Sequence, residues 1–235
     1  MRDVLIIGYG VVGKNLEKEL AALQPDVYDK YLKTGFSEFH YKLAFVCVPA
    51  SEIRTAIKEN SADLYILKSA ILPGTTDLLR EETGERIIYS PEYRGATVHN
   101  DCQFDFTILG GERADCLKAI RILQRAYDGG HQFHMTDAKT AELVKYMENA
   151  FLATKVSFCC QFWEIARQIG VDYPELRELF ILDPRVNPSH TFVFDDYPYW
   201  NTLCLNNDVT AIADAYDAEL LKSVIAYNKK CRKGV

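Results

Sequence analysis

The stretch VLIIGYGVVG, residues 4–13, determines the fold expected for the first part of the chain. Its four leading apolar residues predict a buried strand, and the rest fits the pattern G-x-G-x-x-G. The segment KNLEKELAAL that follows predicts a helix. In such a strand–turn–helix unit, glycines permit a tight turn, close approach to a pyrophosphate and close helix packing. The predicted cofactor-binding residues are therefore Gly8, Gly10, Val11, Val12 and Gly13, although a glycine turn that binds no dinucleotide has the same pattern.

The cofactor predicted from this unit is NAD. Asp29 ends the second predicted strand, DVYD, at the distance expected for a carboxylate that binds the adenosine ribose. A carboxylate there would repel the 2′-phosphate of NADP. Lys30 and Lys33 oppose this inference, because a nearby cation could receive the phosphate, and Lys33 is counted among the predicted cofactor residues.

The first half of the chain alternates strands and helices. Further apolar runs at 43–48, 64–67, 86–90 and 106–109 predict strands with helical segments between them. This alternation is typical of an α/β fold with a Rossmann-like, doubly wound parallel sheet. The pattern changes near Met135, so we predict an NAD-binding domain at 1–136. The rest, 137–235, is predicted to be a long central helix with a small all-helical dimerisation and catalytic domain.

The long helix is predicted over residues 137–169, which contain no proline or glycine. At 1.5 Å per residue it would be about 50 Å long, more than its own sheet domain could cover, so we predict a homodimer. A shorter helix is expected at 173–182 and a last helix from about Asp208 to Cys231, with Asp208 suited to its N-cap.

Composition excludes several classes of partner. The net charge is −6 and no basic tract occurs, which argues against nucleic acid and acidic membranes. Apolar runs are too short to span a bilayer, and a strand beginning by Val4 leaves no room for a signal peptide. Seven cysteines without framework spacing predict reduced thiols and a cytoplasmic location. No clustered His/Cys set predicts a metal site.

Several further segments, taken in order, resemble the UDP-glucose/GDP-mannose dehydrogenase family. The segments are FVCVP (45–49), KSAILPGTT (68–76), SPEYRGA (90–96), AELVKYMENAFLATKVSF (141–158), DPRV (183–186) and LCLNND (203–208). The long-helix segment is the most specific of them, because its Lys, Asn and small residues match over eighteen positions. The chain ends after the helical region, so it resembles a short form without the family's C-terminal UDP-binding domain.

This resemblance implies oxidation of the primary alcohol of a UDP-glucose-like sugar nucleotide, or of a sugar, to a carboxylate with NAD. An aldehyde gives up hydride only after a nucleophile has added to it. A thiolate can add to form a thiohemiacetal, hydride transfer then leaves a thioester, and water releases the acid. By position, the resemblance assigns the nucleophile to Cys204, which on its own would be read as an inert packing thiol.

The resemblance also implies roles for four other residues. Lys145 and Asn149 lie four apart on one helix face and would hold the reacting oxygen. Asp208 would assist the water and proton steps, and Glu92 would lie near the substrate. Without the family, Lys145 and Asn149 would be assigned to a solvated helix face.

Three more positions follow from the resemblance by their place in its motifs. Pro49 and Ser69 would lie beside the nicotinamide. Arg185 would reach the substrate across the dimer interface.

The chain also departs from the family pattern. The glycine-rich run expected before the cysteine reads YWNT, residues 199–202, while Asn207 and Ala70 replace an expected lysine and threonine. Two alternatives therefore remain open. One is a non-catalytic NAD-binding relative. The other is a hydroxyacid or 6-phosphogluconate-type dehydrogenase, which shares the Rossmann domain and uses a lysine but needs no cysteine.

Overall fold

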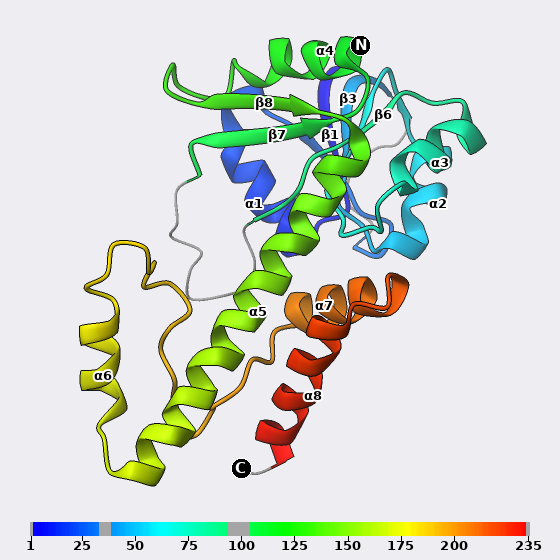
Figure 1. Ribbon diagram of the computed structural model, residues 1–235. Helices are drawn as coiled ribbons and strands as arrows, with labels where there is room; N and C mark the ends of the chain where they lie inside the picture. Colours follow the sequence, from blue (N-terminus) through cyan, green and yellow to red (C-terminus); the bar gives the residue numbers. More distant parts are fainter. Residues whose placement is uncertain (1, 33–38, 94–103, 234–235) are drawn as a thin grey trace. The chain divides into compact units, whose positions relative to one another are not determined.

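One mixed sheet organises the first of two compact units into which the chain divides, residues 1–145 and 146–235. The structure is a computed structural model that describes residues 2–32, 39–93 and 104–233 (Figure 1). The strands are β1 (Arg2–Ile7), β2 (Asp26–Tyr28), β3 (His40–Val46), β4 (Ser61–Ala62), β5 (Tyr65–Leu67), β6 (Ile87–Tyr89), β7 (Phe106–Gly110) and β8 (Gln132–Thr136). Their order is β2-β1-β3-β5-β6-β7-β8, with β4 paired to β3. The predicted Rossmann-like α/β fold is confirmed.

The sheet differs from the predicted all-parallel one at a single step. β6 and β7 run antiparallel through the pair Tyr89–Gly110, while the other paired strands are parallel. The sequence predicted helical segments between the strands, and such crossover connections join parallel neighbours, so the antiparallel step was not expected. β8 was not predicted either, because its exposed and half-buried residues, QFHMT, lack a continuous apolar run.

Helices cover both faces of this sheet. They are α1 (Val11–Glu19), α2 (Ile53–Glu59), α3 (Thr75–Thr83) and α4 (Arg113–Leu123), with short 3₁₀ turns at Ala21–Leu23 and Ala50–Glu52. Along β1, Val4 and Ile6 join the cluster containing α1 and α4, whereas Leu5 and Ile7 join the cluster containing α2 and α3. Figure 1 shows α2 and α3 together on one side of the sheet. The unbroken apolar sequence of β1 thus reflects a strand buried on both faces.

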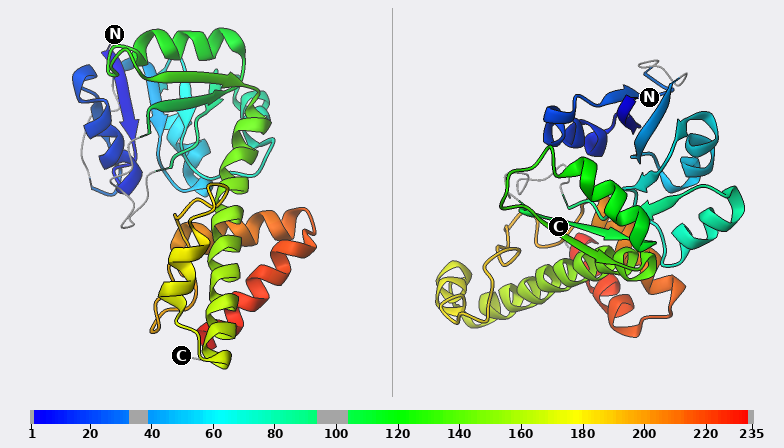
Figure 2. Two further views of the ribbon diagram at one scale, coloured as in Figure 1. Left: turned by 60° about the vertical axis from the view of Figure 1, so that its left-hand side comes forward. Right: turned by 90° about the horizontal axis from the view of Figure 1, so that it is seen from above.

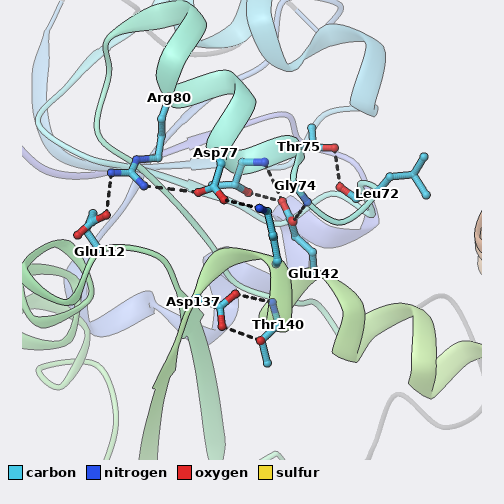
Figure 3. A network of polar contacts seen from close by, with 11 residues as sticks. Leu72, Gly74, Thr75, Asp77, Arg80, Glu112, Asp137, Thr140 and Glu142 are labelled. Carbon is cyan, nitrogen blue, oxygen red and sulfur yellow. Dashed lines mark hydrogen bonds and ion pairs between the residues drawn. The ribbon is translucent and has the colours of Figure 1, made fainter.

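Helix α5 (Ala138–Ile169) begins in this unit and is attached to it by a buried carboxylate. Glu142 is fully buried and accepts hydrogen bonds from Gly74 N at 2.5 Å, Thr76 N at 2.8 Å and Thr76 Oγ1 at 2.6 Å (Figure 3). Gly74 is the N-cap of α3, so the carboxylate satisfies N–H groups that the helix itself leaves unpaired. Burial raises the pKa of Glu142 above its ordinary value, although the Thr76 and Gly74 donors act in the opposite direction.

The second unit contains the rest of α5 with α6 (Tyr173–Phe180), α7 (Leu203–Ala215) and α8 (Glu219–Lys233). Figure 2 shows α6, in yellow, and α8, in red, on opposite sides of α5. One apolar cluster joins α5 to α7 and α8: Ala153, Trp200, Leu205, Val209, Ala213, Val224 and Ile225. A second cluster joins it to α6: Cys159, Trp163, Ala166 and Tyr173. The predicted long helix and helical C-terminal region are therefore confirmed.

The single last helix predicted from about Asp208 to Cys231 is wrong. α7 already begins at Leu203, because Thr202 is the N-cap and its side chain accepts a hydrogen bond from Leu205 N at 3.3 Å. Asp208 lies inside α7, so its predicted N-cap role is also wrong. The chain then breaks between α7 and α8, where Asp217 has a φ of 51°.

The domain boundary predicted at 136/137 stays a prediction; the compact units themselves divide within α5, after Lys145. Within the described residues, no helix combines the length and the apolar character needed to cross a membrane.

Glu142→Ala is expected to lower the free energy of unfolding by about 2–4 kcal/mol, because it leaves buried donors of Gly74 and Thr76 without an acceptor. Glu142→Gln keeps one oxygen acceptor and should cost about half as much. Urea unfolding followed by circular dichroism measures both. The matched control is Glu81→Ala on the exposed side of α3, expected within about 0.5 kcal/mol of wild type. Equal losses in Glu142→Ala and Glu81→Ala would contradict the capping role.

Candidate dinucleotide and catalytic site

The glycine loop between β1 and α1 has the geometry that a dinucleotide requires. Gly8 has a φ of +94°, and a Cβ there would lie 2.8 Å from the Cys47 carbonyl oxygen. A Cβ on Gly13 would lie 2.0 Å from the carbonyl oxygen of Gly8, so a side chain is excluded at both positions. A Cβ on Gly10 would meet nothing within 4 Å, so this side of the loop is open. Val11 and Val12 form the first turn of α1, whose N–H groups suit a pyrophosphate.

The carboxylate of Asp29 is tied to the same loop. Its Oδ2 accepts a hydrogen bond from Tyr9 N at 2.8 Å, and its Oδ1 accepts from Tyr31 N at 2.9 Å and Leu32 N at 3.0 Å. Burial raises the pKa of Asp29, but the N–H groups of Tyr9, Leu32 and Tyr31 outweigh it, and the pKa lies below its ordinary value. Asp29 is therefore anionic at neutral pH, as a ribose ligand that repels a 2′-phosphate must be. Lys33 lies outside the described residues.

A hollow opens beside the loop, on the side of β2. Gly8, Asp29 and Val48 line it with Ile7, Tyr28, Lys30, Tyr31, Glu52, Thr55, Ala56 and Glu59. Apolar and aromatic walls next to a ribose-binding carboxylate suit an adenosine group. The residues present thus fit a dinucleotide.

Pro49 and Ser69 follow neighbouring parallel strands, β3 and β5. The Ser69 hydroxyl donates to the carbonyl oxygen of Val48, which joins the two strand ends. Pro49 is the N-cap of the 3₁₀ turn Ala50–Glu52. Both residues thus lie at the carboxyl edge of the sheet, where ligands bind in open α/β folds.

Glu92 lies beyond the end of β6 and forms an ion pair with Lys68, Oε2 to Nζ, at 3.2 Å. Lys68 also donates to the Pro91 carbonyl oxygen at 3.3 Å. Both charged side chains are largely buried, so each depends on the other for compensation. Burial raises the pKa of the neighbouring Cys47 thiol to about 12, although Lys68 acts in the opposite direction. Cys47 is accordingly a packing thiol.

Lys145 is the last residue of the first unit. Its Nζ lies 5.2 Å from the centre of the Tyr93 ring, which places the ammonium beside the residue that follows Glu92. One turn further along α5, Asn149 is on the same helix face.

In the second unit, the structure brings together two predicted catalytic residues that are 59 positions apart in sequence. Asn149 Nδ2 donates to Asp208 Oδ2 at 2.6 Å, and both side chains are buried. Cys204 is exposed and stands four residues before Asp208, on the first turn of α7. The implied roles of Cys204 as nucleophile and of Lys145 and Asn149 at the reacting oxygen stay predictions.

The run YWNT, which replaces the family's glycines, is held by two helices. Trp200 is buried, and its indole Nε1 donates to Ser157 Oγ of α5 at 3.0 Å. Its backbone N donates to Asn228 Oδ1 at 3.0 Å, and Asn228 Nδ2 donates to the Trp200 carbonyl oxygen at 2.9 Å. Trp200 thus anchors the backbone that leads into Thr202 and Cys204.

Arg185 is exposed and pairs locally with Asp183, its Nη2 lying 2.6 Å from Asp183 Oδ2. In the described part of the chain, its hydrogen bonds all go to Asp183 and none joins it to another predicted site residue. Its predicted role across a dimer interface stays a prediction.

Sequence reasoning missed three contributors to this architecture: Glu142, Lys68 and Asn228. Glu142 had a signal, since an acid in AELVKY stands among residues of an apolar helical face. Lys68 begins the motif KSAILPGTT, but its pairing with Glu92, 24 residues away, had no signal, and neither had the pairing of Asn228 with Trp200, 28 residues away.

Comparisons with known proteins agree with the resemblance seen in the sequence. Residues 139–230 match the UDP-glucose/GDP-mannose dehydrogenase family, central domain. UDP-glucose 6-dehydrogenase YwqF of Bacillus subtilis is 27% identical over 207 residues, covering 82% of this chain and 46% of that protein. UDP-N-acetyl-D-mannosamine dehydrogenase of Methanocaldococcus jannaschii is 33% identical over 133 residues, covering 54% of this chain and 31% of that protein. The chain thus spans about half or less of these relatives.

Solved structures share the fold. A UDP-glucose dehydrogenase from Pyrobaculum islandicum superposes with a TM-score of 0.77 at 20% identity, covering 98% of this chain and 68% of that one. The 3-hydroxyisobutyrate dehydrogenase of Mycobacterium tuberculosis superposes with a TM-score of 0.73 at 15% identity, covering 99% and 94%. The fold is therefore shared with solved structures of both dehydrogenase classes considered from the sequence. The predicted resemblance is confirmed: residues 139–230 match the central domain of the UDP-glucose/GDP-mannose dehydrogenase family.

Proposed function

We propose that this chain forms the NAD-binding and catalytic part of a dehydrogenase that oxidises the primary alcohol of a UDP-glucose-like sugar nucleotide to a carboxylate. The buried Asn149–Asp208 pair, with Cys204 one turn earlier on α7, carries the proposal. Buried titratable groups are frequent at functional sites, and this hydrogen-bonded carboxylate is one turn along α7 from an exposed thiol. The open glycine loop and ionised Asp29 support NAD as the acceptor.

In the proposed reaction, two NAD molecules, bound one after the other at the glycine loop, would each accept one hydride. The alcohol loses a hydride and a proton to become an aldehyde. The Cys204 sulfur then adds to the aldehyde carbon, and Lys145 and Asn149 stabilise the oxygen that becomes negative. Loss of a second hydride leaves a thioester on Cys204. Water attacks that carbonyl, the C–S bond breaks, and Asp208 accepts a proton from the water. Glu92, Pro49 and Ser69 are proposed to border the reacting groups.

We propose that the active form is a dimer built on α5. Met147, Phe151 and Ile169 are 73%, 62% and 70% exposed, although they are large and apolar. They continue a stripe along one helix face that also contains Phe158, Phe162 and Ile165. A second copy of the same stripe would cover it by symmetry, and Arg185 would then be available to a partner's substrate.

Wild-type protein with NAD and UDP-glucose, or another sugar of a nucleotide-sugar and hexose panel, is expected to release two NADH per substrate, measured by absorbance. Cys204→Ser should yield at most one, because the alcohol step needs no thiol, and should retain NAD affinity. Cys116→Ala, a buried cysteine of α4, is the matched control and should still release two.

Two NADH from Cys204→Ser would contradict the nucleophile. One NADH from wild type would favour a hydroxyacid-type dehydrogenase. Absence of turnover with intact NAD binding would favour a non-catalytic relative.

Cys204 is expected to react with iodoacetamide at least about 10-fold faster than Cys116, Cys159, Cys160 and Cys231, because it is exposed and they are buried. Burial also raises the pKa of Cys116 to about 11 and of Cys160 to about 12, which keeps them as unreactive thiols. Mass spectrometry of the labelled peptides measures each rate. Similar rates for Cys204 and any of the four would count against an accessible nucleophile.

Phe151→Asp is expected to convert the dimer to a monomer in sedimentation velocity, because it buries a charge in the apolar stripe. Leu220→Asp on α8 is the matched control: Leu220 is 68% exposed but lies outside the stripe, so the dimer should persist. A wild-type monomer at the highest soluble concentration would refute the α5 dimer.

A further inference from the structure

A polar network stands at the hollow beside the glycine loop. Glu52, the last residue of the 3₁₀ turn after β3, pairs through Oε2 with Lys30 Nζ at 2.9 Å. Its other oxygen, Oε1, accepts a hydrogen bond from the Tyr31 hydroxyl at 2.7 Å. Lys30 Nζ also lies 4.9 Å from the centre of the Tyr31 ring. One carboxylate therefore holds both residues that follow Asp29.

We propose that Glu52 is a specificity-determining residue that selects NAD over NADP by neutralising Lys30. This inference rests on the proposed NAD binding at the Gly8–Gly13 loop. Asp29 alone would be a weak determinant, because the next residue along the chain is a lysine that could bind a 2′-phosphate. Glu52 opposes phosphate binding by Lys30, because its carboxylate already forms an ion pair with the ammonium.

The charges around the hollow support this assignment. The described residues that line it include three carboxylates, Asp29, Glu52 and Glu59, and one ammonium, Lys30. The Tyr31 hydroxyl and the Lys30 ammonium hold the pKa of Glu52 below its ordinary value, and Glu52 raises the pKa of Lys30. The pair therefore stays ionised at neutral pH. A 2′-phosphate, with a charge of about −1.5 to −2, would meet a net negative surface.

The geometry explains why Lys30 cannot serve a phosphate while Glu52 is in place. To donate to a 2′-phosphate, the ammonium would have to leave Glu52 Oε2 and expose that carboxylate to the incoming anion. Because the pair is partly exposed, it adds little to folding stability. Its effect is expected in cofactor selection, which separates this role from a structural one.

The test is calorimetric titration of NAD and NADP into the full chain and its variants. Glu52→Gln keeps an oxygen acceptor for the Tyr31 hydroxyl but removes the charge that holds Lys30. NADP affinity should rise about 10-fold, with NAD affinity within about threefold of wild type. Adding Lys30→Met to this variant should abolish the gain. Glu81→Gln removes an exposed carboxylate of α3 that does not line the hollow, and should change the NADP/NAD affinity ratio by less than about threefold.

Each outcome bears on the proposal. An unchanged NADP affinity in Glu52→Gln, with a wild-type melting temperature and wild-type NAD affinity, overturns the role of Glu52 and leaves NAD binding standing. A gain that survives Lys30→Met, or that Glu81→Gln reproduces, shows that another charge or the net charge of the protein decides, and it also overturns the proposal. Wild-type protein that binds neither cofactor removes the proposed function, and the specificity role with it.

Discussion

The carboxylate of Glu142 at the N-terminus of α3 is the contact that attaches the long helix to the sheet unit. It gathers two N–H groups and a hydroxyl from residues 74 and 76, in a site closed to water. An acid inside an apolar helical face would be destabilising unless such donors met it. Because these donors come from the N-terminal end of α3, the carboxylate holds the start of α5 within the first unit. Lys145 follows three residues later on the same face, so the cap also sets where its ammonium points.

Strands that are buried on both faces could be predicted from the sequence, because such strands contain continuous runs of apolar residues. β1 is the clearest case, with alternate residues in two different apolar clusters. β8 carries no such mark because it is largely half-buried. The end of α7 could not be predicted, because no glycine or proline follows it. Asp217 adopts the left-handed backbone conformation there instead. Patterns with a period of a few residues reveal burial, but they do not reveal partners 66 and 68 residues away, such as the Thr76 and Gly74 donors to Glu142.

Residues of the candidate site could be predicted where they lie in a recognisable sequence motif. Asn149 and Asp208 do meet in the second unit, a pairing that neither residue suggests by itself. The departure at YWNT also has a physical explanation. In place of small residues, this chain inserts an indole into the cluster between α5, α7 and α8 and brackets its backbone with the amide of Asn228. The approach to Cys204 is therefore anchored by packing.

The hydrogen bond from Tyr9 N to Asp29 has a consequence for ligand binding as well as for charge. It spans from the middle of the glycine loop to the end of β2, so the loop is already ordered by the protein's own side chain. Backbone entropy that a mobile phosphate loop would lose on meeting its ligand is lost here during folding. The ligand therefore meets a loop that is already ordered. We expect the enthalpy and heat capacity of binding to reflect contacts and buried area, with little contribution from coupled folding.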